Sequence, residues 1–386
     1  MLVKKFLCAP GPTAVPAEIL SEMSKPLIHH RTPQFDAIVA ENAELLKQVF
    51  KTKNPVVTFT SSGTGAMEAS VTNFLSKGDK AIVVSAGKFG ERFAEICAAY
   101  GVEVVELKNE YGKDVKPVAV AEALKANPDT KAVYTEYSET STAVAFDVKG
   151  IADVVRKTDA IMVVDAITAV GAMEFEMDAW GVDVAVAGSQ KSFMIPPGLS
   201  FLTVSDKGMK AMEKSTLPKY YFNIAGEIKA LGKNTTAWTP AVTVMIGLNH
   251  ALKMMIAEGI DNVIKRHFTV AEAIRVGVQA IGLKLFADVP NVRPSDAVTA
   301  VRVPEGVEGK KIPGLMQNKF GVTVAGGQGS MAGNIFRLGS LGYMDKTDVI
   351  IQLQAMELAL KELGYKFEAG KSVAAGQKYL MENMQF

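Results

Sequence analysis

One segment organises the rest of the chain, and it reads VDVAVAGSQKSFMIPPG over residues 182–198. Its apolar start predicts a short strand, and the turn at residues 188–190 brings Lys191 directly after it. Two prolines and a glycine at 196–198 then end regular structure. A lysine at the end of a strand is most often a solvated charge. The alternative is an amine made nucleophilic by partial removal from water, as in a lysine that forms a Schiff base with an aldehyde.

The length and composition of the chain limit its class. Its 386 residues exceed what one hydrophobic core usually serves, so we expect a large and a small domain. The 42 basic and 41 acidic side chains leave a net charge of +1, which argues against a global basic field for nucleic acid or an anionic membrane. We predict an N-terminal arm over residues 1–20, a large domain over 21–260 and a small domain over 261–386.

The cysteine pattern and the hydropathy of the sequence indicate whether the protein is exported, membrane-bound or cytoplasmic. Cys8 and Cys97 are its two cysteines, and neither lies in a CxxC or Cys/His pattern, which argues against a disulfide framework and a zinc module. No apolar run approaches the length needed to span a bilayer, and residues 1–8 are too short for a signal peptide. We therefore expect a cytoplasmic protein that binds no metal.

Strands and helices alternate through the first half of the chain. The predicted strand at 160–165 is a nearly continuous apolar run that ends at Asp165, and such runs are typical of strands buried on both faces of a sheet. The alternation predicts an α/β fold with a mainly parallel sheet and helical crossovers. Strands are expected at 56–60, 80–85, 102–107, 131–135, 160–165, 182–188 and 199–204, and helices at 35–50, 92–100, 118–126 and 151–157.

The turn that follows the strand at 56–60 is a candidate anion site. Ser62, Gly63 and Thr64 lie at the start of a helix, where free backbone N–H groups and the positive end of the helix dipole meet. A phosphate would suit this position, and the alternative is a plain helix cap by Ser62 or Thr64. A dinucleotide site is disfavoured, because Gly63-x-Gly65 lacks a third glycine and no acidic residue ends a second strand at the expected distance.

Further side chains follow the predicted strands in the same way. Phe89, Thr140, Asp165, Gln190 and Lys191 each lie just past the carboxyl end of a strand, where α/β sheets bind ligands. One edge of the sheet would then present an aromatic face, a carboxylate and a lysine beside the phosphate cradle. Pyridoxal phosphate needs such a set of groups. The aromatic face packs on its ring, the carboxylate faces its pyridine nitrogen, the lysine bonds to its aldehyde, and the anion site binds its phosphate. A structural role for Asp165 at a strand end stays open as an alternative.

The last part of the chain predicts an α+β region. Arg337 lies in one of its predicted strands. It is either a charged residue on the surface or a guanidinium that binds a carboxylate through a bidentate contact. The glycine-rich residues 324–329 predict a flexible lid or turn, and residues 234–240 predict a polar turn. Helices are expected at 242–258, 260–280 and 348–363, and strands at 283–286, 298–303 and 335–338.

Several motifs together resemble one known family. They are Pro10-Gly11-Pro12, His30-Arg31-Thr32-Pro33, Ser62-Gly63-Thr64-Gly65, Val164-Asp165, Gly188-Ser189-Gln190-Lys191 and Arg337-Leu338-Gly339. With them the chain resembles the class V, pyridoxal phosphate-dependent aminotransferases, in the alanine/serine–glyoxylate (serine–pyruvate) branch, over nearly its whole length. The resemblance implies the type I fold of aspartate aminotransferase and a homodimer with active sites at the subunit interface.

The resemblance also implies a role for each matched residue. Lys191 would form the Schiff base and carry protons, and Asp165 would face the pyridine nitrogen. Phe89 stands where relatives often have a ring-stacking tryptophan, and Ala143 stands where glycine is common. The implied cofactor-binding residues are Ser62, Gly63, Thr64, Phe89, Thr140, Asp165, Gln190, Lys191, and Thr236 and Thr239 from the neighbouring subunit, and the implied substrate-binding residues are Arg337 and Gly11.

These inferences predict transamination between alanine or serine and a 2-oxo acid, glyoxylate or pyruvate. Two alternatives share the fold, an aminotransferase of the 2-aminoethylphosphonate type and a cysteine desulfurase. The desulfurase needs a mobile cysteine in a loop of the small domain, and neither Cys8 nor Cys97 lies there. A non-catalytic subunit is the third alternative, and the presence of Lys191, Asp165 and Arg337 together argues against it.

Overall fold

A seven-stranded sheet forms the centre of the computed structural model, which describes residues 3–287 and 293–384. Its strand order is β2-β10-β9-β8-β5-β3-β4, in which β10 runs antiparallel to both neighbours and the other pairs are parallel. The predicted α/β fold with a mainly parallel sheet is confirmed. The strands are β2 (Val56–Phe59), β3 (Lys80–Ser85), β4 (Glu103–Lys108), β5 (Thr130–Glu136), β8 (Ile161–Asp165), β9 (Val184–Gly188) and β10 (Ser200–Val204).

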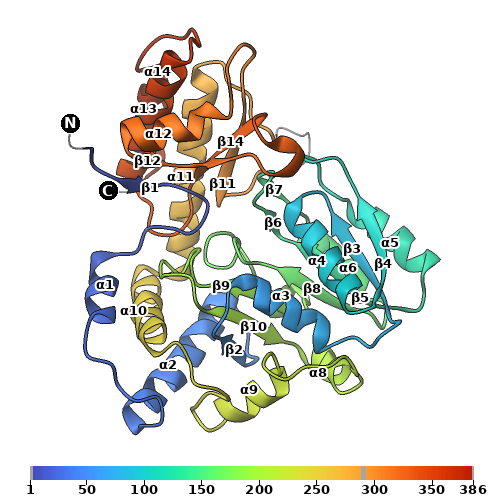
Figure 1. The fold of residues 1–386 in the computed structure, drawn as a ribbon. Coiled ribbons are helices and arrows are strands. Elements are labelled where there is room, and N and C mark those ends of the chain that lie inside the picture. Colours follow the sequence, from blue (N-terminus) through green and yellow to red (C-terminus); the bar gives the residue numbers. More distant parts are fainter. Residues whose placement is uncertain (1–2, 288–292, 385–386) are drawn as a thin grey trace.

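Successive residues of each strand point to opposite faces of this sheet. In β8, Val164 packs into one apolar cluster and Val163 into another, and all five residues of the strand are buried. Helices cover both faces, which explains why the strand has no polar alternation (Figure 1). Asp165 ends β8 on the same face as Val163, and α3 (Gly63–Thr72) and α4 (Lys88–Ala99) pack on this face.

The helices around the sheet mostly begin near their predicted positions. The helix predicted at 35–50 is α2 (Pro33–Phe50), and its N-cap Thr32 accepts a hydrogen bond from the backbone N–H of Phe35. The helix predicted at 92–100 begins four residues earlier, as α4. The other helices of this part are α1 (Ala17–Met23), α5 (Pro117–Ala126), α6 (Val148–Val155), α7 (Met177–Trp180), α8 (Asp206–Met212), α9 (Ile224–Leu231) and α10 (Val242–Glu258).

A separate apolar cluster holds the last part of the chain together (Figure 1, orange to red). Its three-stranded antiparallel sheet has the order β11-β14-β13. The N-terminal strand β1 (Phe6–Leu7) joins this part by pairing in parallel with β12 (Val322–Thr323). The remaining elements are α11 (Ile260–Ala280), β11 (Val298–Arg302), α12 (Lys311–Phe320), β13 (Ala325–Gly326), a 3₁₀ turn (Gly329–Met331), β14 (Ile335–Gly339), α13 (Lys346–Glu362) and α14 (Lys371–Asn383).

The structure differs from the prediction at three places in this part. Residues 283–286 form no strand, since Leu285 makes only an isolated bridge to Val301. Residues 324–329 are not all turn, because β13 pairs there with β14. The helix predicted from residue 348 begins at Lys346, where Asp345 and Asp348 form a capping box. The domain boundaries themselves stay a prediction.

Two general features of the described ranges bear on where the protein acts and what it binds. None of their helices combines the length and the apolar character needed to cross a membrane. Within these same ranges, no three His, Cys, Asp or Glu side chains are grouped so that they could hold a metal ion.

Candidate active site

One pocket at the carboxyl edge of the large sheet brings most of the predicted site residues together. The predicted residues that line it are Ser62, Gly63, Thr64, Phe89, Thr140, Asp165, Gln190 and Lys191. Four residues that the sequence reasoning did not select also line it, namely Arg92, Ser138, Ile167 and Thr168. The residues predicted to follow the carboxyl ends of strands therefore do lie together, while their roles in binding a ligand stay a prediction.

Lys191 follows β9 and turns its amine toward the N-terminal arm. Its Nζ donates a hydrogen bond to the backbone oxygen of Pro10 over 2.8 Å. Gly11 lies directly beside this amine with φ +119°, and a Cβ there would overlap with Lys191 Nζ. Burial lowers the pKa of Lys191 to about 8, while the charge of Asp165 opposes the shift. The amine is thus partly neutral near neutral pH, as a nucleophile must be.

Asp165 ends β8 with its carboxylate in the same pocket. The side chain is 6% exposed, and its Oδ1 accepts a hydrogen bond from the backbone N–H of Ile167 over 2.8 Å. Burial raises the pKa of Asp165 to about 7, and the positive charges of Arg92 and Lys191 oppose that shift. A buried carboxyl with one backbone donor has capacity to bind a further N–H group.

The start of α3 supplies neutral hydrogen-bond donors. Ser62 is the N-cap of this helix, and its side chain makes no capping hydrogen bond, so its hydroxyl is available to a ligand. A Cβ at Gly63 would lie 2.5 Å from Ile167 Cδ1, so a larger residue there would require the Ile167 side chain to shift. Across the pocket, Gln190 has a buried Oε1 with no hydrogen-bond partner in the described structure. The Ser62 hydroxyl and the free backbone N–H groups at the start of α3 are donors that suit a phosphate, and the Gln190 side chain could add its amide N–H groups, since its Oε1 only accepts.

Phe89 is held at the start of α4 by a buried carboxylate. Glu139 Oε2 accepts from the backbone N–H of Phe89 over 3.0 Å and of Gly90 over 3.2 Å, and its Oε1 accepts from Ser141 N over 3.0 Å. Glu139 is part of β6 (Ser138–Glu139), which pairs with β7 (Val144–Ala145). The aromatic ring therefore has a fixed backbone position beside the pocket.

Thr140 and Arg337 lie next to each other at the border of the pocket. Arg337 Nη1 donates to the backbone oxygen of Thr140 over 2.9 Å, and its Nε donates to Gly326 O over 3.0 Å. Arg337 is 5% exposed, and burial lowers its pKa to about 10. Ala143, the departure from the expected glycine, has φ +63°, so this position does favour glycine.

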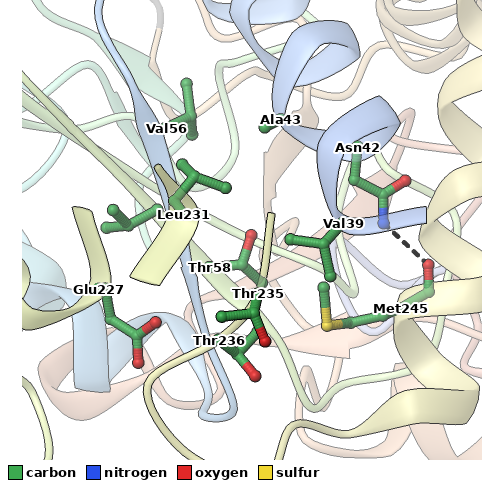
Figure 2. A pocket seen from close by; sticks show the side chains of 11 residues that line it. Val39, Asn42, Ala43, Val56, Thr58, Glu227, Leu231, Thr235, Thr236 and Met245 are labelled. Atoms are coloured by element: carbon green, nitrogen blue, oxygen red, sulfur yellow. Dashed lines mark hydrogen bonds between the residues drawn. The ribbon is translucent and has the colours of Figure 1, made fainter. Parts of the chain in front are cut away.

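Thr236 and Thr239 do not line this pocket. Thr236 lies beside a second, small pocket near Glu227, α2 and β2 (Figure 2). Its hydroxyl donates to Trp238 O over 2.7 Å, and Arg31 Nη1 donates to Thr236 O over 2.8 Å. Arg31 therefore anchors the 234–240 loop. A role of this loop at the pocket of a second subunit is not tested by one chain and stays a prediction.

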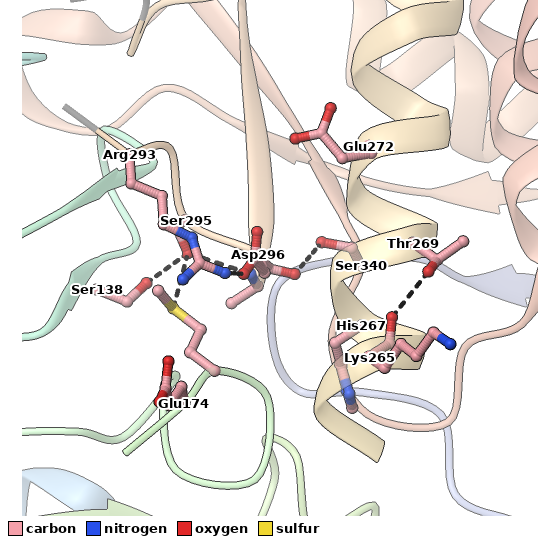
Figure 3. Close-up of polar contacts among 12 residues, drawn as sticks. Ser138, Glu174, Lys265, His267, Thr269, Glu272, Arg293, Ser295, Asp296 and Ser340 are labelled. Carbon is pink, nitrogen blue, oxygen red and sulfur yellow. Dashed lines mark hydrogen bonds and ion pairs between the residues drawn. The ribbon is translucent and has the colours of Figure 1, made fainter. Parts of the chain in front are cut away.

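Polar contacts tie the floor of the pocket to α11. Ser138 Oγ and Ser295 Oγ share a hydrogen bond of 2.6 Å (Figure 3). The neighbouring Asp296 is fully buried, and it forms ion pairs with Arg275 of α11, at 3.2 Å, and with Arg293. This network joins residues distant in sequence, and it sets the position of β6 relative to the last part of the chain.

Glu136 is a buried acid that the sequence reasoning also missed. It pairs in register with Asp165 on the adjacent strand, and both of its carboxyl oxygens are buried without a hydrogen-bond partner in the described structure. Burial raises its pKa well above the usual value, and the charges of Glu139 and Asp165 add to the shift while Arg92 opposes it. Because its pKa is raised in the folded state, Glu136 keeps its proton to a higher pH in the folded protein than in the unfolded chain.

We expect Glu136→Gln to raise the stability of the cofactor-free protein increasingly as the pH rises. The pKa of Glu136 is higher in the folded protein than in the unfolded chain. Its protonated form therefore contributes fully to stability below the pKa of the unfolded chain, and this contribution is lost as the pH rises toward the pKa of the folded protein. Glutamine does not titrate and loses nothing over this range. Thermal unfolding at pH 5 and at pH 8 measures the effect. Glu139→Gln is the matched control, and it should be less stable because four donors point at that carboxylate. An equal difference between Glu136→Gln and the natural protein at both pH values would contradict the prediction.

The pocket has the chemistry that pyridoxal phosphate requires. It combines an amine of lowered pKa, a buried carboxyl, an aromatic side chain and a set of neutral donors at a helix start. The family model for class V aminotransferases matches residues 6–349. The chain belongs to the class V aminotransferases. It is therefore an aminotransferase that uses pyridoxal phosphate, as the motifs predicted.

Relatives of this class V aminotransferase extend over its whole length. It is 41% identical to the small subunit of a soluble hydrogenase from Synechococcus sp. (strain PCC 6716), which covers 98% of both chains. It is 36% identical to an L-aspartate–glyoxylate aminotransferase from Paracoccus denitrificans (96% of this chain, 94% of the relative) and 35% identical to a serine–glyoxylate aminotransferase from Hyphomicrobium methylovorum (99% and 96%).

The solved structures agree with the family assignment. A ureidoglycine–glyoxylate aminotransferase from Bacillus subtilis matches with a TM-score of 0.93 and 27% identity over 99% of both chains. The predicted type I fold of the pyridoxal phosphate-dependent aminotransferases is thereby confirmed for this class V aminotransferase.

Proposed function

We propose that this aminotransferase moves the amino group of alanine or serine to glyoxylate or pyruvate. The observation that carries the proposal is the convergence of Lys191, Asp165 and the α3 cradle in one pocket. Three of the proteins compared above carry glyoxylate in their names, whereas their named donors are aspartate, serine and ureidoglycine. This supports glyoxylate as the first choice of acceptor, and the donor depends on details of the site.

Lys191 and Asp165 would carry the central chemistry. When bound, pyridoxal phosphate supplies an aldehyde that bonds to amines and a ring that withdraws electrons from the substrate. Lys191 Nζ would be the group that holds that aldehyde, and the same amine would accept the proton of the substrate α-carbon. The Asp165 carboxylate would hold a proton on the ring nitrogen by charge and hydrogen bonding.

The remaining residues would hold and orient the ligands. The hydroxyls of Ser62 and Thr64, the Gly63 N–H and the Gln190 amide would bind the phosphate, and Phe89 would cover the ring. The Thr140 hydroxyl, which shares a hydrogen bond of 3.0 Å with Thr168, would lie near the ring.

Arg337 would bind the substrate carboxylate, with Gly11 leaving room beside Lys191. Two of the five guanidinium N–H groups already donate to backbone oxygens, so three remain for a carboxylate. The hydrogen bonds to Gly326 and Thr140 fix the plane of the guanidinium. This orientation favours a bidentate contact, in which two N–H groups bind the two oxygens of the substrate carboxylate.

A homodimer in the cytoplasm is part of the proposal. Thr236 and Thr239 would reach the phosphate of the neighbouring subunit, which is consistent with their distance from the pocket of their own chain. The two free cysteines, Cys8 and Cys97, suit a reducing compartment. The domain division at residues 20 and 260 belongs to the same proposal.

The alternatives on the same fold receive less support. Burial raises the pKa of Cys8 and of Cys97 to about 12, so neither thiol is a ready nucleophile for a desulfurase. A non-catalytic role finds a parallel in the hydrogenase-subunit name of one relative. The complete pocket argues against that role for this chain.

A screen of half-reactions tests the proposed substrates. Addition of alanine or serine to the protein with bound cofactor should bleach its visible absorption band, and glyoxylate should restore the band. We expect kcat/KM for the better of these donors to exceed that for 2-aminoethylphosphonate at least about tenfold. Aspartate serves as a third donor, because one relative is named for it. A protein that cannot be loaded with pyridoxal phosphate, or that responds to 2-aminoethylphosphonate alone, would overturn the proposal.

A further inference from the structure

The phosphate cradle of the proposed function contains only neutral groups. Its donors are two hydroxyls, a backbone N–H and an amide, whereas a phosphate monoester carries a charge of about −1.5 to −2 at neutral pH. Two cationic side chains line the described pocket, Lys191 and Arg92. Because Lys191 is needed at the aldehyde, Arg92 is left to balance the phosphate charge. This step rests on the proposed function, which places the phosphate at α3.

Arg92 already lies at the edge of that cradle. Its Nη1 donates a hydrogen bond to the Thr64 hydroxyl over 3.2 Å. The guanidinium carbon lies 4.8 Å from the centre of the Phe89 ring, so the side chain spans the space between the aromatic residue and the start of α3. Arg92 follows Phe89 by one helical turn on α4, and the Glu139 contacts fix the start of this helix.

Among the described residues, Arg92 forms no ion pair with a carboxylate, although its charge acts on the nearby acids Asp165 and Glu136. Its described contacts are the Thr64 hydroxyl and the Phe89 ring, both neutral, whereas the nearby Lys88 of the same helix pairs with Glu91. The positive charge of Arg92 opposes the rise in the pKa of Asp165 and adds to the lowering of the pKa of Lys191, so the guanidinium acts electrostatically on both groups. An unpaired guanidinium beside neutral phosphate donors is a site for an anion.

We propose that Arg92 is the charged ligand of the cofactor phosphate, bound together with the Thr64 hydroxyl. A hydrogen bond to a charged group contributes about 1.5–3 kcal/mol, and every 1.4 kcal/mol corresponds to tenfold in affinity. Arg92→Gln should therefore weaken pyridoxal phosphate binding about tenfold to a hundredfold. Binding of pyridoxal, which has the same ring and aldehyde without the phosphate, should stay within about threefold of the natural protein.

Equilibrium titration of the cofactor-free protein with pyridoxal phosphate and with pyridoxal tests this assignment by absorbance. Arg92→Lys keeps the positive charge and loses the planar guanidinium. Its affinity for pyridoxal phosphate should therefore fall less than that of Arg92→Gln. Lys88→Gln is the matched control, since it removes one positive charge from the same helix outside the pocket, and it should leave both affinities unchanged. If Arg92→Gln does not fold, Arg92→Lys decides the question by the same comparison.

The two affinities separate the possible results. A loss confined to pyridoxal phosphate supports the assignment. An equal loss for both ligands would show a structural role, and unchanged affinities combined with a lower kcat/KM for aspartate would assign Arg92 to a substrate carboxylate. Either result overturns the proposal, while normal loading of the natural protein in the same titration keeps the proposed function intact. A natural protein that binds neither ligand would overturn both.

Discussion

Replacing Lys191 with alanine is expected to lower the transamination rate by at least about 10³-fold, because the variant loses both the bonding amine and the proton carrier. The pocket lining in the described structure contains no second lysine that could take over. The main-chain oxygen of Pro10, 2.8 Å from Lys191 Nζ, shows how closely the amine is positioned. Steady-state assays with alanine or serine and glyoxylate measure the loss, and the visible spectrum follows the bound cofactor.

Two further results distinguish this role from a structural one. Lys191→Arg should lose activity to a similar extent, because a guanidinium stays protonated and cannot bond to the aldehyde. Without cofactor, Lys191→Ala should be at least as stable as the natural protein at pH 7. Burial lowers the pKa of Lys191 from 10.5 to about 8. Below about pH 8 the buried amine is charged, which destabilises the folded protein. This cost disappears as the pH rises from about 8 to 10.5, where the folded protein loses the proton more readily than the unfolded chain. Full activity in either variant would refute the role.

Much of this site could be predicted because its residues follow strands. The apolar run that ends at Asp165 and the short strand before Lys191 each predict a buried element and its carboxyl end. Parallel strands bring those ends to one edge, so the order of residues in the sequence was enough to group them. Ser62 could be assigned to the same site, because a strand, a turn and the start of a helix follow one another in the sequence and together predict an anion site.

The parts that could not be predicted depend on contacts between distant segments. Arg92 reaches the pocket from the side of a helix, and its contact with Thr64 depends on how α3 and α4 pack. Ser138 and Ser295 are 157 residues apart, and no local pattern joins them. The pairing of β1 with β12 is likewise long-range, since a two-residue strand has little signal of its own.

Asp165→Asn is expected to lower kcat by about 10²- to 10³-fold, as removal of one electrostatic contact in an active site commonly does. Asparagine keeps the shape and can still accept from Ile167 N, but it carries no charge to hold a proton on the ring nitrogen.

Asp183→Asn is the matched control for that result, because Asp183 is also 6% exposed and accepts hydrogen bonds from Met162 N and the Ser205 hydroxyl at the opposite end of β9. That control should lower the unfolding temperature and leave kcat within a few-fold of the natural protein, since it lies outside the pocket. A similar kcat loss in both variants would mean that Asp165 acts through the stability of the sheet. A loss at Asp165 alone, measured under saturating cofactor, would assign its carboxylate to the cofactor ring.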